Sequence, residues 1–285
     1  MKISMMRVAM SLMKDLSSRA GRELGRLTAP SAESLREVDW EKWVRHFERN
    51  KRNRPEPDWD VATRISPGIV NALLPSLEQF ELGDGGGPAC LIAFDAEAFR
   101  SCTRNVQRVV DAWFEEEKGH ARLLGRAVDR FGGKHIKTHW SFSAFCAVRR
   151  FLGVRFELET LLLTEIVSSA YYRVLKRNVE DRPLKEMCAL ILRDEAGHIA
   201  FHLERLAAAD RSVVGIRRQL WEAQFWLLGF TAATVLWVNH GPCLWPLGAT
   251  NGEFYREVRR EIFRFVLRLK RRAGLEPWNV QIASH

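Results

Sequence analysis

The sequence of 285 residues lacks cysteine pairs and long apolar runs. Its five cysteines, an odd number, form no Cys-x-x-Cys pair, which favours buried free thiols in a reducing compartment. The longest apolar run, Phe225 to Val238, is shorter than the roughly 20 residues that span a bilayer. The segment from Met1 to Met13 is apolar, but Arg7 breaks the run that a secretory signal needs. We therefore expect a cytoplasmic protein, soluble or peripheral to a membrane.

Acidic residues are outnumbered by basic ones, and the formal net charge is +9. A surface of this sign favours anionic partners, such as an acidic carrier protein or an anionic membrane surface. The chain carries no known nucleic-acid-binding motif, so we do not expect nucleic acid as a partner. A homodimer is a further arrangement that the sequence leaves open.

Strand-like alternation is also scarce, and the patterns predict an all-α protein. We divide the chain into a peripheral N-terminal arm with a short docking helix (1–60), a main body (61–210) and C-terminal helices packed on it (211–285). A helix begins at Ser66-Pro67, is interrupted from Gly83 to Pro88 and resumes in CLIAFDAEAF. The other expected helices cover about 39–50, 103–131, 142–177, 182–209, 212–239 and 251–272.

Two Glu-x-x-His motifs lie midway along two of the expected helices. They are Glu117 with His120, and Glu195 with His198, and both read acid-Glu-x-Gly-His. The i, i+3 spacing places each pair on one helical face, where both side chains can reach one point. Apolar residues flank both motifs, and buried Glu or His is costly unless it is paired or binds a metal. Two such pairs, with one carboxylate from each of two more helices, make the two-metal site of ferritin-like bundles.

The third carboxylate follows from helix geometry. Glu165 lies in the apolar stretch LETLLLTEIVSSAYY, and 195 − 165 = 30 places the midpoint near the NVEDRP turn. Two antiparallel helices joined there would hold Glu165 and Glu195 at the same height. Glu157 and Glu159 are alternatives, but they lie roughly two turns away at 3.6 residues per turn.

The fourth carboxylate is less closely defined. Reflecting Glu117 about the turn at Ser101–Arg104 points to Asp84, since 117 − 84 = 33. The segment GDGGGP also suits a turn, in which case Asp84 is only a turn residue. Glu81 and Glu78 are the alternatives.

This order of acid, ExxH, acid and ExxH resembles the ferritin-like di-iron carboxylate superfamily over about residues 66–210. That superfamily includes bacterioferritins, rubrerythrins, acyl-carrier-protein desaturases and arylamine N-oxygenases. The stretches FELGDGGG, FEEEKGHARLLGRAVDRFG and DEAGHIAFH are similar to an uncharacterised bacterial branch, in which glutamate usually stands where Asp84 does. The resemblance implies a four-helix bundle with a long crossover between its second and third helices, plus extra N- and C-terminal helices.

The resemblance also implies the role of each ligand. Glu117 and Glu195 would bridge two metal ions, Asp84 and Glu165 would be terminal carboxylates, and His120 and His198 would each bind one ion. Oxygen and nitrogen ligands without thiolate suit two iron ions, with manganese or a mixed pair as alternatives. The residues expected to support the ligands are Glu116, Asp194, His202 and Tyr172.

Several functions share such a site, and the fold does not choose among them. We favour an O2-dependent oxidase, desaturase or hydroxylase whose catalytic carboxylates are Glu117 and Glu195. The aromatic segment at 220–245 would wall an apolar pocket for an organic substrate, lipid or carrier-bound, and the alternative is that it simply packs on the bundle. No flavin or nicotinamide motif is present, so electrons would come from an external donor. The alternatives are a ferroxidase or iron-handling protein and a non-catalytic helical interaction protein.

Overall fold

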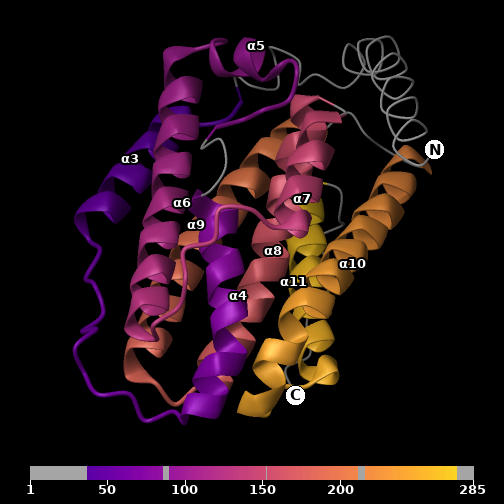
Figure 1. Ribbon diagram of the computed structural model, residues 1–285. Coiled ribbons are helices and arrows are strands. Elements are labelled where there is room, and N and C mark those ends of the chain that lie inside the picture. Colours follow the sequence, from indigo (N-terminus) through magenta and orange to yellow (C-terminus); the bar gives the residue numbers. More distant parts are fainter. Residues whose placement is uncertain (1–36, 86–89, 152, 211–215, 275–285) are drawn as a thin grey trace, which may run out of the picture. The chain divides into compact units, whose positions relative to one another are not determined.

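The computed structural model describes residues 37–85, 90–151, 153–210 and 216–274, and most of the expected N-terminal arm lies outside them (Figure 1). These residues form helices and connections without a strand, which confirms the all-α prediction. None of their helices combines the length and apolar character needed to cross a membrane. The elements are α3 (Trp40–Arg52), α4 (Pro67–Gly85), α5 (Ala96–Arg100), α6 (Arg104–Arg130), α7 (Trp140–Phe151), α8 (Val154–Asn178), α9 (Arg182–Asp210), α10 (Ile216–Leu244), the 3-10 turn η1 (Trp245–Leu247) and α11 (Asn251–Arg272).

The described residues belong to two compact units. The first contains 40–60 and 74–161, and the second contains 37–39, 61–73 and residues from 162 onward. The division falls inside α4 and α8, so each of these helices contributes residues to both units. The three-part division of the chain and the ferritin-like bundle with its long crossover stay predictions.

In the first unit, α6 packs against α3 and α5. The Thr103 side chain accepts a hydrogen bond from the Val106 amide at 3.2 Å and so begins α6. Gly132, with φ of 70°, ends the helix in the left-handed conformation that glycine adopts readily. Both helix ends are predictable from the sequence. The first ExxH motif therefore lies in the middle of a helix of 27 residues.

Two expected helices are shorter or broken. The predicted helix at 142–177 is two helices, α7 and α8, because Gly153 has φ of 90° between them and the Asp95 carboxylate accepts from the Val154 amide at 2.6 Å. The segment expected to resume as a helix at CLIAFDAEAF is helical only in α5. Its earlier residues form bends and turns, in which the Ile92 and Ala93 amides donate to the Glu157 carboxylate and not to a helical carbonyl.

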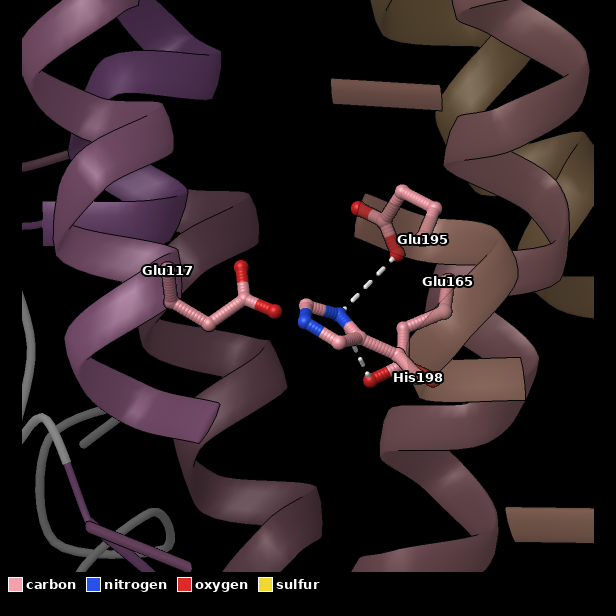
Figure 2. Close-up of side chains that lie close together, drawn as sticks. All are labelled: Glu117, Glu165, Glu195 and His198. Atoms are coloured by element: carbon pink, nitrogen blue, oxygen red, sulfur yellow. Dashed lines mark ion pairs between the residues drawn. The ribbon is translucent and has the colours of Figure 1, made fainter. Parts of the chain in front are cut away.

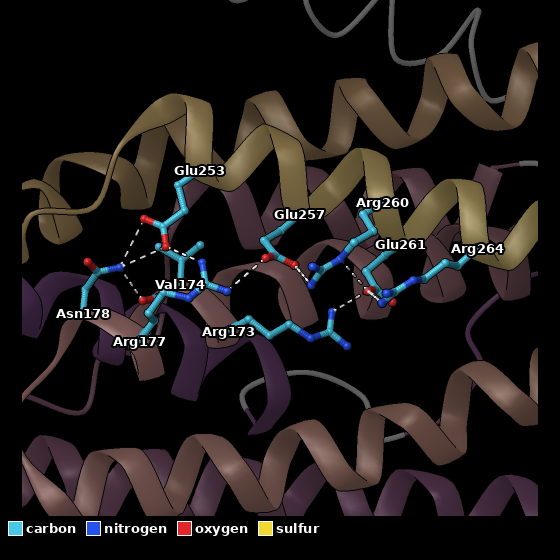
Figure 3. A network of polar contacts seen from close by, with 9 residues as sticks. All are labelled: Arg173, Val174, Arg177, Asn178, Glu253, Glu257, Arg260, Glu261 and Arg264. Carbon is cyan, nitrogen blue, oxygen red and sulfur yellow. Dashed lines mark hydrogen bonds and ion pairs between the residues drawn. The ribbon is translucent and has the colours of Figure 1, made fainter. Parts of the chain in front are cut away.

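In the second unit, α11 packs against both α9 and α10. A ladder of ion pairs joins α8 to α11, in which Arg173 and Arg177 bind Glu253, Glu257 and Glu261 (Figure 3). The aromatic helix α10 meets α11 closely, since Phe225 stacks on Phe265 at 5.4 Å. The buried side of the 220–245 segment therefore packs on α11. That its aromatic residues also wall a substrate pocket stays a prediction.

Candidate metal centre

The second unit gathers one carboxylate from α8 with the Glu and His of the second ExxH motif. Glu165, Glu195 and His198 each offer one ligand atom within 4.8 Å of the others, and all three are buried. His198 Nδ1 lies 3.5 Å from Glu195 Oε2 and 3.7 Å from Glu165 Oε1 (Figure 2). Two carboxylates and an imidazole so close together form a compact set of oxygen and nitrogen donors. The fourth side chain drawn in Figure 2, Glu117, belongs to the first unit and is described with it.

The antiparallel pairing of helices across the NVEDRP turn predicts Glu165 beside this motif, and the structure brings them together. α8 ends at Asn178 and α9 begins at Arg182, so the turn is as short as the argument needs. Glu157 serves another purpose in the first unit. Its buried carboxylate receives two amide hydrogen bonds and binds the Arg149 guanidinium at 2.9 Å. Burial raises the pKa of Glu157, while the amides and Arg149 oppose that rise.

The first unit holds a second cluster built in the same way. Asp84 from α4 joins Glu117 and His120 of α6, again with ligand atoms within 4.8 Å of one another. His120 is fully buried, and its Nδ1 lies 3.4 Å from Glu117 Oε2. The Trp113 indole donates to Glu117 Oε1 at 3.2 Å and fixes the orientation of that carboxylate. Trp113 precedes Glu117 by one helical turn, a signal that the sequence contained and that our interpretation did not use.

Asp84 reaches this cluster because α4 passes very close to α6. A Cβ added to the neighbouring Gly85 would stand 2.7 Å from the Ala121 Cβ, so a larger residue there would force the helices apart. The two alternative acids of α4 lie elsewhere. Glu81 Oε1 is 2.7 Å from the His135 ring, and Glu78 accepts the Lys134 amide at 2.8 Å. Of the three candidates, Asp84 is the one that the structure brings to the ExxH motif.

The residues expected to support the ligands have the following neighbours. Glu116 is buried and pairs with Arg54 at 3.8 Å. The missing side chain of Gly119 leaves space for that arginine, because a Cβ added at Gly119 would lie 3.1 Å from the Arg54 Cζ. Asp194 is buried and binds Arg193 at 3.0 Å. The roles expected for Glu116 and Asp194 in fixing histidine tautomers stay predictions. Arg54 lies in the irregular segment after α3, where no periodicity marked it.

His202 lies beside the second cluster. Its Nε2 is 3.7 Å from Glu165 Oε2, and its Nδ1 is 3.3 Å from Arg205, which follows one turn later on α9. The i, i+3 relation of His202 and Arg205 was readable in the sequence and was missed. Tyr172 is buried with its ring edge against Tyr171, at 5.3 Å between centroids, and Tyr171 in turn contacts His240 at 5.6 Å. These aromatic residues pack beside the α8 segment that carries Glu165.

Both clusters fit a divalent transition metal by the chemistry of their donors. Each combines two carboxylates with one imidazole and contains no thiolate. Such sets suit iron or manganese, whereas structural zinc sites usually use cysteine and histidine. Within the residues that the structure describes, the fold is all-helical and two carboxylate–histidine groups are able to hold metal ions. Comparison with family models, curated proteins and solved structures finds no match to this chain, so the ferritin-like resemblance rests on the motifs alone.

Proposed function

We propose that the ligands of these clusters hold two iron ions and that the protein is an O2-dependent oxidase or oxygenase of an organic substrate. One observation carries the proposal: each compact unit repeats the same ligand set, an acid with the Glu and His of an ExxH motif. Repetition of that set is the ligand arrangement of two-metal carboxylate proteins. Manganese, alone or mixed with iron, is compatible with the same donors.

Each ligand takes its role from its place in the motif. Glu117 and Glu195 stand at the same motif position in the two clusters, and we assign them as bridging carboxylates. Asp84 and Glu165 would then be the terminal carboxylates, and His120 and His198 would each hold one ion. Four carboxylates bring four negative charges, which balance two ferrous ions and stabilise the higher charge of two ferric ions.

An iron pair, when bound, supplies the electrons and the Lewis acidity for reaction with O2. The chain supplies the rest. The burial of His120, His198, Glu165 and Glu195 excludes bulk water from the ligands. Trp113 holds the Glu117 carboxylate by its indole hydrogen bond, so that carboxylate keeps its direction as charge changes at the site. The electron donor is external in this proposal.

The first test is the metal content of the purified chain by mass spectrometry after growth or loading with iron and manganese. We expect about two metals per chain, and we expect Glu117→Ala and Glu195→Ala to lose both. The matched control is Glu81→Gln, because Glu81 is an acid of α4 that pairs with His135 and lies outside the cluster. Two metals retained in either ligand variant would refute the assignment.

The second test separates oxidation of a substrate from iron handling. The ferrous-loaded protein is mixed with oxygen, and iron and oxygen consumption are followed together. We expect one round of oxygen consumption per bound pair, renewed only when an electron donor is added. Continued consumption of added ferrous iron would instead assign the protein as a ferroxidase.

A further inference from the structure

The outward side of α10 carries a stripe of large apolar residues. Ile216, Leu220, Leu227 and Val238 are each exposed to 63–68%. They are separated by 4, 7 and 11 residues, which are close to whole helical turns, so the four side chains lie on one narrow face. The stripe continues beyond the helix at Trp245, which is 54% exposed. With 29 residues, α10 is about 44 Å long, and the stripe runs along most of it.

Charge is missing from this stretch of the chain. Residues 223–245 contain no Asp, Glu, Lys or Arg. The single acid of α10, Glu222, is bound by Arg218 at 3.0 Å and by Lys270 at 2.9 Å. A long exposed apolar face on a described helix is larger than scattered surface residues explain, and such faces mark interaction sites.

An arginine edge lies beside this stripe on α11. Tyr255 of α11 donates a hydrogen bond to Thr234, which lies on the α10 stripe between Leu227 and Val238, so the two exposed faces meet there. On the same side of α11, Arg256 and Arg259 are exposed, and neither forms an ion pair with another described residue. Phe263, one turn beyond Arg259, is 59% exposed. The surface therefore combines an apolar stripe with an arginine edge.

The acids of α11 cannot neutralise that edge, because they face the other way. Glu253 and Glu257 bind Arg177, and Glu261 binds Arg173; both arginines belong to α8 (Figure 3). The ladder thus orients α11 with its carboxylates inward and Arg256 and Arg259 outward. A partner for this surface must bring both apolar contact and negative charge.

We propose that the α10 stripe and the arginine edge of α11 form a docking surface for an anionic phospholipid membrane. Helices that lie in the membrane interface present an apolar face flanked by basic residues, with tryptophan near the headgroups. Lipid phosphates supply negative charges with which Arg256 and Arg259 can pair. The same face of a second copy would bring the same arginines and no outward carboxylate, so charge complementarity favours lipid over that symmetric contact. This inference is independent of the proposed metal chemistry.

The test is sedimentation of the full chain with vesicles of phosphatidylcholine, alone or with about one third phosphatidylglycerol. We expect binding to the anionic vesicles, weakened by high salt, because screening shortens the reach of the arginines. Each arginine near an anionic surface contributes about 1 kcal/mol, or about fivefold in affinity, so Arg256→Ala with Arg259→Ala should weaken binding about 25-fold. Leu227→Glu should weaken it by about tenfold or more, since it places a charge in the stripe.

The matched controls are Val148→Glu on α7, at a valine that is 45% exposed, and Arg126→Ala on the exposed side of α6. Both should bind vesicles as the unchanged protein does. Equal loss in Val148→Glu and Leu227→Glu would overturn the proposal, because binding would then not depend on the stripe. Absence of vesicle binding would also overturn it, and a dimer detected by light scattering that Leu227→Glu dissociates would assign the stripe to a second copy instead.

Discussion

Of the three buried glutamates of α8, two, Glu157 and Glu165, should change stability in opposite directions when each is replaced by glutamine. Glu157 faces the Arg149 guanidinium, which is 4% exposed, whereas Glu165 lies within 4.8 Å of a second buried carboxylate, Glu195. Glutamine keeps the shape of the side chain and removes its charge. The pair of variants therefore compares an attractive with a repulsive environment on one helix.

The magnitudes follow from the contacts. Two unit charges 4.8 Å apart repel by about 3.5 kcal/mol at an effective dielectric constant of 20, which sets the scale of what Glu165→Gln can gain in metal-free protein. Glu157→Gln leaves the Arg149 charge buried without its counter-charge, and breaking a buried pair costs about 3–5 kcal/mol. With Mn²⁺ at about a hundred times its dissociation constant, the unchanged protein should gain about 2.7 kcal/mol.

The assay is urea unfolding followed by helical circular dichroism, in chelator and in Mn²⁺. We expect Glu165→Gln to be at least as stable as the unchanged protein in chelator and less stable in Mn²⁺. Glu157→Gln should be destabilised by the same amount in both. If Glu165→Gln loses as much as Glu157→Gln in chelator, Glu165 is a structural carboxylate, and if Mn²⁺ stabilises Glu165→Gln fully, Glu165 is not a ligand.

Three further predictions concern groups outside the clusters. Burial raises the pKa of the Cys188 thiol to about 12, so Cys188 should resist thiol reagents in the native protein. The exposed Cys102 should react, and all five thiols should react once denaturant unfolds the chain. Hydrogen bonds to Glu81 and Asp129 raise the pKa of His135, so its stabilising effect is complete below its ordinary value of 6.5 and is lost as pH rises through the raised value. His135→Ala should therefore lower the melting temperature at pH 6 and leave it unchanged at alkaline pH; an equal loss at both would refute the pairing. Gly229→Val should cost about 1–3 kcal/mol in urea unfolding, because even its Cβ would stand 2.6 Å from Ile262 Cδ1, and Gly252→Ala, with nothing within 4 Å, is the control.

Much of the fold could be predicted because helix ends are coded locally. Proline at the start of α4, the Thr103 cap of α6 and the glycines after Phe131 are signals within a few residues of the boundary they set. The predicted range at 251–272 matches α11, and the range at 182–209 ends one residue before α9 does. The break between α7 and α8 was missed because it depends on a hydrogen bond from the Val154 amide to the Asp95 carboxylate, more than fifty residues earlier.

The candidate ligands were predictable for a similar reason. An ExxH pair is a local pattern, and Glu165 followed from one short turn between antiparallel helices. The segment from Cys90 to Asp95 was less predictable, since its apolar pattern favours a helix while two of its amides bind a carboxylate from α8. At this segment tertiary hydrogen bonds override the local helix propensity, and a short window of sequence does not contain their acceptor.

Glu157 differs from Glu165 and Glu195 in the partner that the chain places beside each buried carboxylate. Glu157 is matched by an arginine, which keeps its charge in any protein environment and so completes the pair within the chain. Glu165 and Glu195 are matched with His198, whose ring nitrogen can bind a metal ion when neutral. An arginine in that place would neutralise the carboxylates permanently and exclude a metal. A neutral histidine leaves the negative charge of the carboxylates to be balanced by a bound metal ion. For this reason Glu165 is a candidate ligand and Glu157 is not.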